Sequence, residues 1–204
     1  MHRIQRRKEC QVMDLQEILK ALSSNPVEPT DAPNAPGLYA IIGSTEFWEE
    51  LGLGLPPDER PLYVGKAEKS LLLRDVRQHF GTGKTGSSTV RRSVAALLKA
   101  KHGYVGVPRN PAKPGHFSNY ALGLEHDERL TRWMLTNLRL GTWSPRDADS
   151  VVLDEWETKV LDACGPPLNL SKVKTDWTAE LKRLRKALAD EARRTLVTSG
   201  GTGL

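Results

Sequence analysis

Two stretches decide the fold of this chain, GLYAIIG at residues 37–43 and PLYVG at residues 61–65. Each is short, apolar and bounded by glycine or proline, which is the pattern of a buried β-strand. Proline, asparagine and aspartate crowd residues 25–36 and predict an irregular segment before the first strand. Residues 46–60 hold one helical turn and then glycine and proline turns, so the connection between the two strands is long.

Apolar residues at helical spacing predict that much of the remaining chain is helical. The last helical segment is the longest, with Trp177, Leu181 and Leu188 on one face and lysines and arginines on the other. Residues 81–88 are rich in glycine and residues 103–118 in proline, so both are expected to be loops. The expected helices are 12–22, 70–80, 89–101, 128–138, 154–164 and 176–196, and a third strand is expected at 138–144.

Composition excludes several classes of protein. Hydrophobic residues make up 38% and charged residues 27% of the 204, as in a globular protein. No apolar run approaches the roughly 20 residues that cross a bilayer, and the basic N-terminus lacks the apolar part of a secretory signal. Cys10 and Cys164 lie far apart, without the spacing of a disulfide scaffold or a thiolate zinc site. We therefore expect a cytoplasmic protein with no membrane partner.

Four motifs occur in a fixed order along the chain. The first two are GLY at 37–39 and YVG at 63–65, one on each expected strand. The third is Arg74 in the helix that follows. The fourth is Glu157, twelve residues before Asn169 in the segment ETKVLDACGPPLN. Each motif alone is common, but the ordered set resembles the GIY-YIG nuclease family.

The resemblance implies an α/β (α+β) fold with a small, mostly antiparallel three-stranded sheet flanked by helices. Residues 1–35 would be an N-terminal helical extension and linker, 36–170 the nuclease domain, and 171–204 a C-terminal basic helix with a disordered tail. The implied activity is that of a metal-dependent DNA endonuclease using Mg²⁺, with Mn²⁺ as an alternative, that leaves a 5′-phosphate and a 3′-hydroxyl. The net charge of +5 suits a nucleic-acid partner, although a basic balance alone is weak evidence.

Two features depart from the family pattern. The connection between the strands is longer than usual, so residues 44–60 are expected to be an insertion. His79 lies five residues after Arg74, where family members often carry a histidine or tyrosine at four. Arg77 is therefore an alternative to Arg74 as the catalytic arginine.

Phosphodiester hydrolysis needs an activated water and charge relief on the phosphoryl oxygens. Glu157 is a hard oxygen ligand suited to Mg²⁺, and Arg74 can bind the scissile phosphate with its planar fork. Tyr39 or Tyr63 can act as the general base if its pKa falls from about 10, which the cation of Lys66 would favour. The expected catalytic set, converging at one end of the sheet, is Tyr39, Tyr63, Lys66, Arg74, His79, Glu157 and Asn169.

Each candidate also has an ordinary structural interpretation. The two tyrosines could pack a core, and Arg74 could lie on a solvated helix face. Glu157 follows Asp154 and Glu155 in what is usually a surface acidic run, and Asn169 after two prolines could cap a turn. All of these interpretations must hold at once to displace the nuclease.

The segment GTGKT at residues 81–85 superficially resembles a phosphate-binding P-loop, but Gln78 stands where that pattern needs a glycine. We expect instead a flexible loop whose polar side chains contact DNA phosphates. The expected nucleic-acid contacts are Lys84, Ser87, Ser88, Arg91 and Arg92, with Lys182 and Arg185 from the last helix.

Two other functions stay open at this point: a catalytically silent nucleic-acid-binding protein with the same fold, and a nucleotide-binding protein that uses residues 81–85. No separate DNA-reading module is visible in the sequence. Target choice is therefore expected to come from residues 44–60, 81–92, 103–118 or the basic last helix. The oligomeric state is open as well, although cutting both strands of a palindrome would favour a homodimer.

Overall fold

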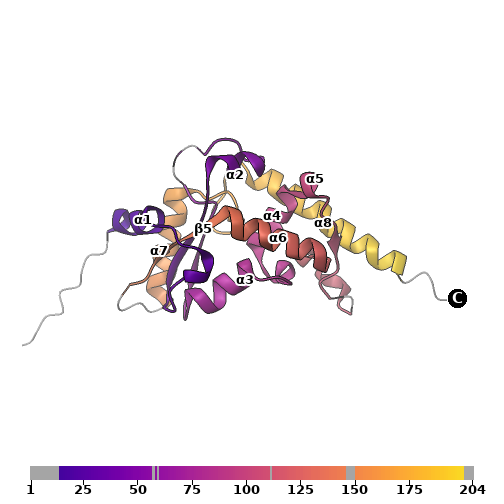
Figure 1. Cartoon of the computed structure of the whole chain (residues 1–204), viewed down its shortest axis with the longest axis horizontal. Helices are drawn as coiled ribbons and strands as arrows, with labels where there is room; N and C mark the ends of the chain where they lie inside the picture. The colour runs from indigo at the N-terminus through magenta and orange to yellow at the C-terminus, as the bar shows by residue number, and fades with distance from the viewer. Residues whose placement is uncertain (1–13, 57, 59, 111, 146–149, 200–204) are drawn as a thin grey trace, which may run out of the picture.

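The computed structural model places most of the chain (Figure 1), and within the placed part no helix combines the length and the apolarity needed to cross a membrane. Cys10, the basic N-terminal segment and the end of the glycine-rich tail lie outside the described residues. The described residues are 14–56, 58, 60–110, 112–145 and 150–199.

A three-stranded sheet lies at the centre of the fold. β1 (Gly37–Gly43) is its middle strand, between β2 (Tyr63–Ala67) and β5 (Leu138–Trp143), and both pairs are antiparallel. In the register of the first pair Tyr39 lies opposite Gly65. The predicted fold class, with an antiparallel three-stranded sheet and flanking helices, is confirmed.

One face of the sheet packs against two helices that are far apart in the sequence, α1 (Leu15–Ser24) and α7 (Ser150–Cys164). Leu38, Ala40 and Val64 point toward them and are buried in this smaller core. Because side chains alternate along a strand, Tyr39 and Ile41 point to the opposite face.

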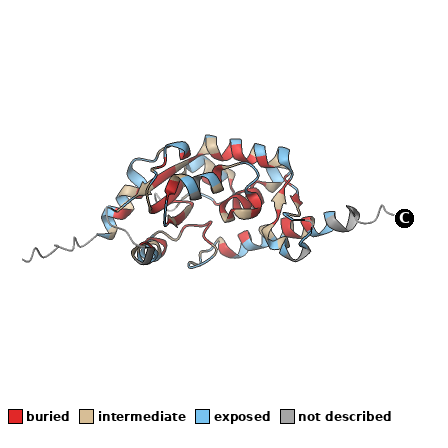
Figure 2. Cartoon of the chain, turned by 90° about the horizontal axis from the view of Figure 1, so that it is seen from below, coloured by how far each residue is buried: buried red, intermediate tan, exposed pale blue. Residues whose placement is uncertain are grey.

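That opposite face is covered by a larger core (Figure 2), in which the buried residues of each helix face inward and the exposed ones outward. Val94 of α4 (Thr89–Leu97) and Met134 of α6 (Leu124–Asn137) are fully buried here. The long helix α8 (Thr178–Ser199) lies alongside α4 and contributes Leu188. Figure 1 shows α8 running from the centre of the molecule to its far end.

The segment after β2 is not the single α-helix that periodicity predicts. It opens with π-helical turns, η2 (Leu71–Val76), and ends as the short helix α3 (Arg77–Phe80). A π turn holds one residue more than an α turn. This extra residue fits the five-residue spacing from Arg74 to His79.

The expected loop at 103–118 holds a short strand, β3 (Gly106–Val107), which pairs with β4 (Ala121–Leu122) in a second sheet. Strands of two residues are too short to leave an alternating pattern in the sequence. The expected helix at 89–101 is interrupted at Leu98. The remaining short elements are η1 (Pro29–Asp31), α2 (Thr45–Glu50), η3 (Thr85–Ser87), α5 (Lys99–His102) and η4 (Pro114–Asn119).

Part of the segment 44–60, which was expected to be an insertion, packs into the large core through Trp48, Leu51 and Leu53. Trp48 of α2 is 1% exposed, and its ring meets Trp177 edge to face, with the centroids 5.8 Å apart. The Trp177 indole N–H donates to the carbonyl of Leu53 at 3.0 Å. The connection between β1 and β2 therefore holds the start of α8.

The glycine-rich segment 81–88 is fixed by a buried ion pair. Arg91 is 0% exposed, and its Nη2 lies 2.9 Å from Oδ2 of Asp127. The same carboxylate accepts the Gly83 backbone N–H and the Thr85 hydroxyl. This corrects the expectation that Arg91 contacts DNA phosphates from a flexible loop, because its guanidinium faces the core.

We predict that Asp127→Ala lowers the free energy of unfolding by about 3–5 kcal/mol, because it leaves a buried guanidinium without its counter-ion. Urea unfolding measures this loss. Glu180→Ala is the control: Glu180 pairs with Arg183 on the exposed side of α8, so its loss should leave the free energy of unfolding nearly unchanged. Equal losses in the two variants would show that the buried pair has no special role.

Candidate active site

The expected catalytic side chains gather around a cavity of about 270 Å³ beside β2. Three come from the strands that carry the GLY and YVG motifs, one from α3 and one from α7, so segments far apart in the sequence meet here. Five of the seven predicted residues line the cavity: Tyr39, Tyr63, Lys66, His79 and Glu157.

The position of Tyr39 depends on the glycine opposite it. A Cβ atom at Gly65 would lie 2.5 Å from the Tyr39 hydroxyl oxygen and 2.6 Å from its Cζ. Such contacts are far inside van der Waals distance, so the tyrosine ring can lie across β2 only because residue 65 has no side chain. This gives a physical reason for the glycine of the YVG motif.

A chain of hydrogen bonds holds the Tyr39 hydroxyl. Its oxygen lies 2.8 Å from Nε2 of His79, and Nδ1 of His79 lies 2.7 Å from Oγ of Ser88. Ser88 is fully buried and caps α4, where its Oγ accepts the Arg91 backbone N–H at 3.1 Å.

The donors and acceptors that are present determine which atom donates in each of these hydrogen bonds. A buried hydroxyl needs an acceptor for its proton, and the second hydrogen-bond partner of the Ser88 Oγ is Nδ1 of His79. The serine therefore donates to Nδ1, which leaves Nε2 as the protonated nitrogen that donates to Tyr39. An N–H aimed at the tyrosine oxygen favours the phenolate over the phenol.

His79 is 6% exposed, and burial together with the charge of Arg91 lowers its pKa to about 3. The imidazole is therefore neutral at ordinary pH. Its ring centroid lies 5.8 Å from that of Tyr39 and 5.6 Å from that of Tyr63. The three rings form one aromatic cluster in the wall of the cavity.

Charged groups reach the cavity from the opposite face of the sheet. The Glu157 side chain is 12% exposed, and its Oε2 lies 2.6 Å from Nζ of Lys172. Asp154, one turn earlier on α7, contacts both Lys172 at 2.7 Å and Lys66 at 3.3 Å. Although burial opposes it, hydrogen bonds to Glu68 and Asp154 raise the pKa of Lys66, which keeps this lysine cationic.

The donor set fits a divalent ion held by one carboxylate. Among the described residues no group of three or more His, Cys, Asp or Glu side chains converges. Mg²⁺ does not need such a cage, because it commonly keeps several waters and binds one or two carboxylates together with substrate phosphates. Glu157 in the cavity wall is suited to that arrangement.

Asn169 supports β2 rather than lining this cavity. Its Oδ1 accepts the backbone N–H of Val64 at 2.9 Å, and its Nδ2 donates to the carbonyl of the same residue at 2.8 Å. The side-chain amide thereby makes the pair of hydrogen bonds that a neighbouring strand would make with the edge strand β2. Asn169 lines an adjacent cavity instead, to which Tyr63 also belongs.

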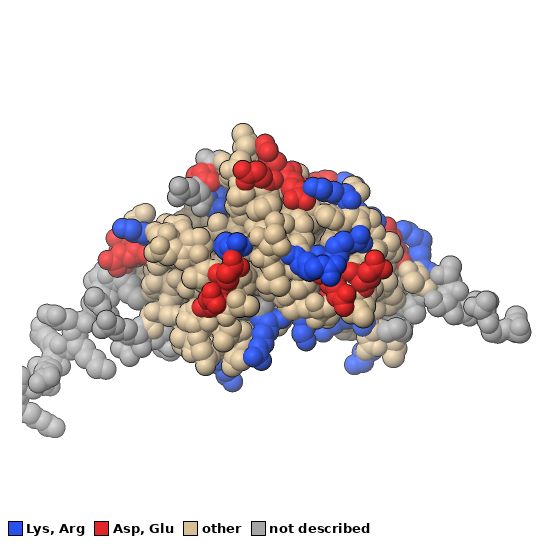
Figure 3. Space-filling view, in the orientation of Figure 1, with Lys and Arg blue, Asp and Glu red and all other residues tan. Residues whose placement is uncertain are grey.

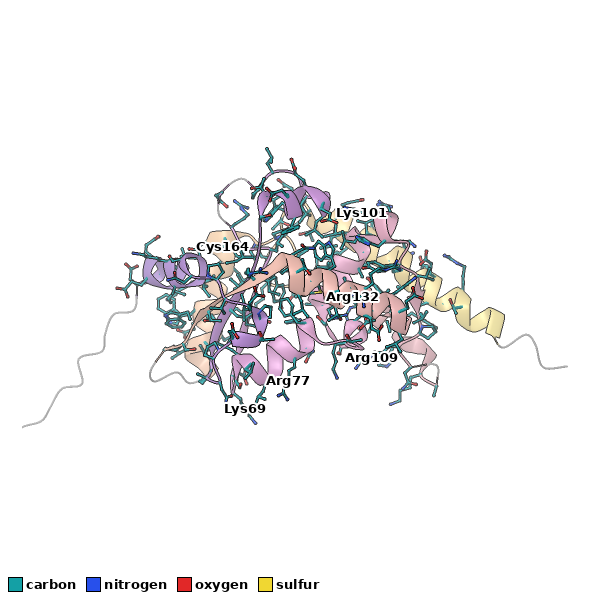
Figure 4. The ribbon with its side chains drawn as sticks, viewed as in Figure 1. Lys69, Arg77, Lys101, Arg109, Arg132 and Cys164 are labelled. Atoms are coloured by element: carbon teal, nitrogen blue, oxygen red, sulfur yellow. The ribbon has the colours of Figure 1, made fainter. Side chains whose placement is uncertain are left out.

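The arginines of the η2–α3 segment are placed differently. The side chain of Arg74 lies outside what the structure describes, although its backbone is in η2. Arg77 is exposed, is labelled at the lower edge in Figure 4, and is not among the residues that line the cavity.

The expected DNA-contact residues divide into three groups. Lys84 is exposed, and Ser87 and Arg92 line the 270 Å³ cavity beside β2, so the DNA contacts expected of these three stay predictions. Ser88 and Arg91 face inward, which corrects the expectation for both, because each is fully buried in the hydrogen-bond network that holds His79 and the loop. Lys182 and Arg185 line the adjacent cavity.

Sequence reasoning missed the positions of Gln78, Thr89 and Lys172 at the site. Gln78 and Thr89 line the cavity, and Lys172 pairs with Glu157. Lys172 has a φ of 67°, a backbone conformation that L-residues rarely adopt, within the segment after Asn169. No periodicity or short motif distinguishes these residues, because their importance lies in which distant segment they meet.

A cavity with tyrosines, a lysine, an arginine and a carboxylate contains the functional groups of a phosphodiester hydrolase. A family model described as the GIY-YIG catalytic domain matches residues 57–187. The chain therefore belongs to the GIY-YIG family, and it is an endonuclease, as the sequence predicted. The match begins after β1, so the pairing of β1 with β2 is what places Tyr39 in this site. Comparison with curated proteins and with solved structures finds no match.

We predict that buried His79 makes the fold sensitive to acid. Its folded-state pKa of about 3 lies below the unfolded value of 6.5, so the unfolded chain binds a proton that the folded chain refuses. The associated stability is complete above pH 6.5 and falls by up to about 1.4 kcal/mol per pH unit below it. Urea unfolding between pH 7 and pH 5 should show a shallower loss in His79→Gln than in the parent. An exposed control, His116→Gln, should keep the parent slope; equal slopes for parent and His79→Gln would contradict the assignment.

Proposed function

We propose that the chain is a metal-dependent DNA endonuclease in which Tyr39 activates the attacking water. The observation that carries the proposal is the meeting of Tyr39, Lys66 and Glu157 around one cavity. Each group corresponds to a need of the reaction: a base for the water, a cation for developing charge, and a carboxylate for a divalent ion.

Tyr39 is suited to the role of base by the N–H of His79, 2.8 Å away. A neutral imidazole that donates a hydrogen bond from Nε2 stabilises the phenolate. The imidazole keeps its own proton while doing so. The cation of Lys66 in the same wall acts in the same direction. Tyr63, whose ring lies 6.0 Å from that of Tyr39, would orient the water or the phosphate.

Glu157 would hold the divalent ion, Mg²⁺ or Mn²⁺. Once bound, such an ion polarises the scissile phosphate and neutralises charge on its oxygens. Lys172 now neutralises this carboxylate at 2.6 Å. The in-line attack of water should leave a 5′-phosphate and a 3′-hydroxyl, as the family resemblance implies.

An exposed basic edge supports a nucleic-acid substrate. Figure 3 shows lysines and arginines along the lower edge of the molecule, and Figure 4 labels Lys69, Arg77 and Arg109 there. These three side chains and Lys84 are exposed, and within the described residues none forms an ion pair with a carboxylate. Unpaired surface cations of this kind contact phosphates and make binding depend on salt.

The P-loop alternative loses its basis in the structure. In a P-loop the backbone N–H groups of the glycine-rich turn cradle phosphates. Here the Gly83 N–H is already bound by the carboxylate of Asp127, which also pairs with Arg91. An anion of the protein occupies the position that a nucleotide phosphate would need.

We predict that Glu157→Gln lowers metal-dependent cleavage of supercoiled plasmid by about a thousandfold or more, because it removes the negative ligand. Circular dichroism and thermal unfolding should match the parent. Glu155→Gln, an exposed neighbour on the same helix, is the control and should cleave normally. Full cleavage by Glu157→Gln would sink the metal assignment.

The two arginines of the η2–α3 segment give a second test. Arg74→Ala should lower the cleavage rate by about a hundredfold, since it removes a phosphate-binding fork. Arg77→Ala should cost about threefold or less, as expected for an exposed phosphate contact. Cleavage rates under saturating metal compare the two variants, and the reverse order would show that Arg77 is the catalytic arginine.

A further inference from the structure

A second, larger cavity of about 540 Å³ adjoins the catalytic one, and Tyr63 and Thr89 line both. One wall of it is the basic face of α8. Among its lining residues Asp190 is the one carboxylate, and this group already pairs with Lys186 at 2.8 Å and Arg193 at 2.7 Å.

Two arginines lie where the cavities meet. Arg92 lines the catalytic cavity and is 8% exposed, while Arg185 of α8 lines the larger one and is partly buried. The Arg185 Nη1 donates to the hydroxyl of Thr89 at 3.0 Å, so the residue shared by both cavities connects the two.

Neither guanidinium has a carboxylate partner within the described residues. Arg92 donates from Nη1 to the carbonyl of Gly86 at 2.8 Å, and its Nε is buried without a hydrogen-bond partner. Burial and repulsion by Arg185 lower the pKa of Arg92 to about 10, which leaves it charged at neutral pH. Repulsion by Arg109, which packs over Gly86, adds to the effect.

Comparison with the adjacent Arg91 shows that Arg92 lacks a counter-ion among the described residues. Arg91 is also buried, but Asp127 neutralises it. Burying charge is costly unless it is paired, and here two like charges are held together without an internal counter-ion. The missing partner is an anion from outside, and a phosphate oxygen suits the planar fork of a guanidinium.

We propose that Arg92, Arg185 and Thr89 form a binding site for a second phosphate of the substrate strand, next to the phosphate that is cut. The proposal rests on the nuclease function and specifies its substrate: a strand that continues from the catalytic cavity into the groove along α8, past Lys182. A scissile bond without a phosphate on that neighbouring nucleotide would be bound weakly. The site thus favours internal bonds of a polynucleotide over a dinucleotide.

Inorganic phosphate is the first probe, because it needs neither metal nor a known target. It should raise the melting temperature of the full chain in a concentration-dependent way. Arg92→Gln and Arg185→Gln should lose most of that rise, and Arg183→Gln, an exposed control on α8, should keep it. Arg185→Lys retains the charge and should keep part of it, which separates loss of the site from misfolding.

Oligonucleotides with one neutral methylphosphonate test the position on the strand. In a Glu157→Gln background, fluorescence anisotropy should show one linkage beside the cut site at which the substitution weakens binding about tenfold. The same substitution should cost nothing further in Arg92→Gln or Arg185→Gln.

Two results would overturn the proposal. In the first, phosphate raises the melting temperature of Arg92→Gln and Arg185→Gln as much as that of Arg183→Gln. In the second, the methylphosphonate weakens binding equally in the parent and in both variants. Its failure is distinguishable from failure of the proposed function. Cleavage by the parent together with either result removes the site and leaves the nuclease. A phosphate response that depends on both arginines, with no cleavage of any DNA, retains the site and removes the nuclease.

Discussion

The absence of a side chain at Gly65 is the constraint on which the site depends. The Tyr39 ring crosses β2 at that residue, and any Cβ there would overlap the hydroxyl end of the ring. Without this crossing the phenol could not reach both His79 and the cavity. The pairing of β1 with β2 therefore shapes the site as well as the sheet, because its register sets Tyr39 opposite Gly65, which leaves room for the ring.

Two polar systems then hold this arrangement in place. Asn169 satisfies the backbone of Val64 on the outer side of β2, so the edge strand is fixed from the side that has no neighbouring strand. On the other side, the hydrogen-bond chain from the α4 amide through Ser88 to His79 fixes the imidazole. In the proposed mechanism a flexible tyrosine would spend much of its time away from the attacking water, so this rigidity would favour the reaction.

Local pattern predicted a good part of this architecture. β1 was predicted with its observed bounds, because glycines mark both ends of its apolar run, and the third strand was expected at 138–144 and is found at Leu138–Trp143. The family motifs identified five side chains that do line one cavity. The fold class was predictable for the same reason, since the motifs come with a known order of elements.

The sequence could not show that two adjacent arginines have different environments in the fold. Arg91 and Arg92 are neighbours in the chain, yet one is neutralised in the core and the other lines the site. The difference is made by Asp127, 36 residues away, and by the groove of α8, and neither leaves a local signal. The π-helical turns before His79 were visible only as an unexpected spacing, because helix type is decided by packing as well as by propensity.

The anchoring of α8 by residues 44–60 links two features that otherwise look unrelated. Trp177 stands directly before the helix and is held by Trp48 and by the carbonyl of Leu53. The start of α8 is thus held in place by the connection between β1 and β2, although the two segments lie far apart in the sequence. Loss of the Trp48 ring would therefore act at a distance, on the position of the basic face of α8, although Trp48 lines neither the catalytic cavity nor the larger one beside it.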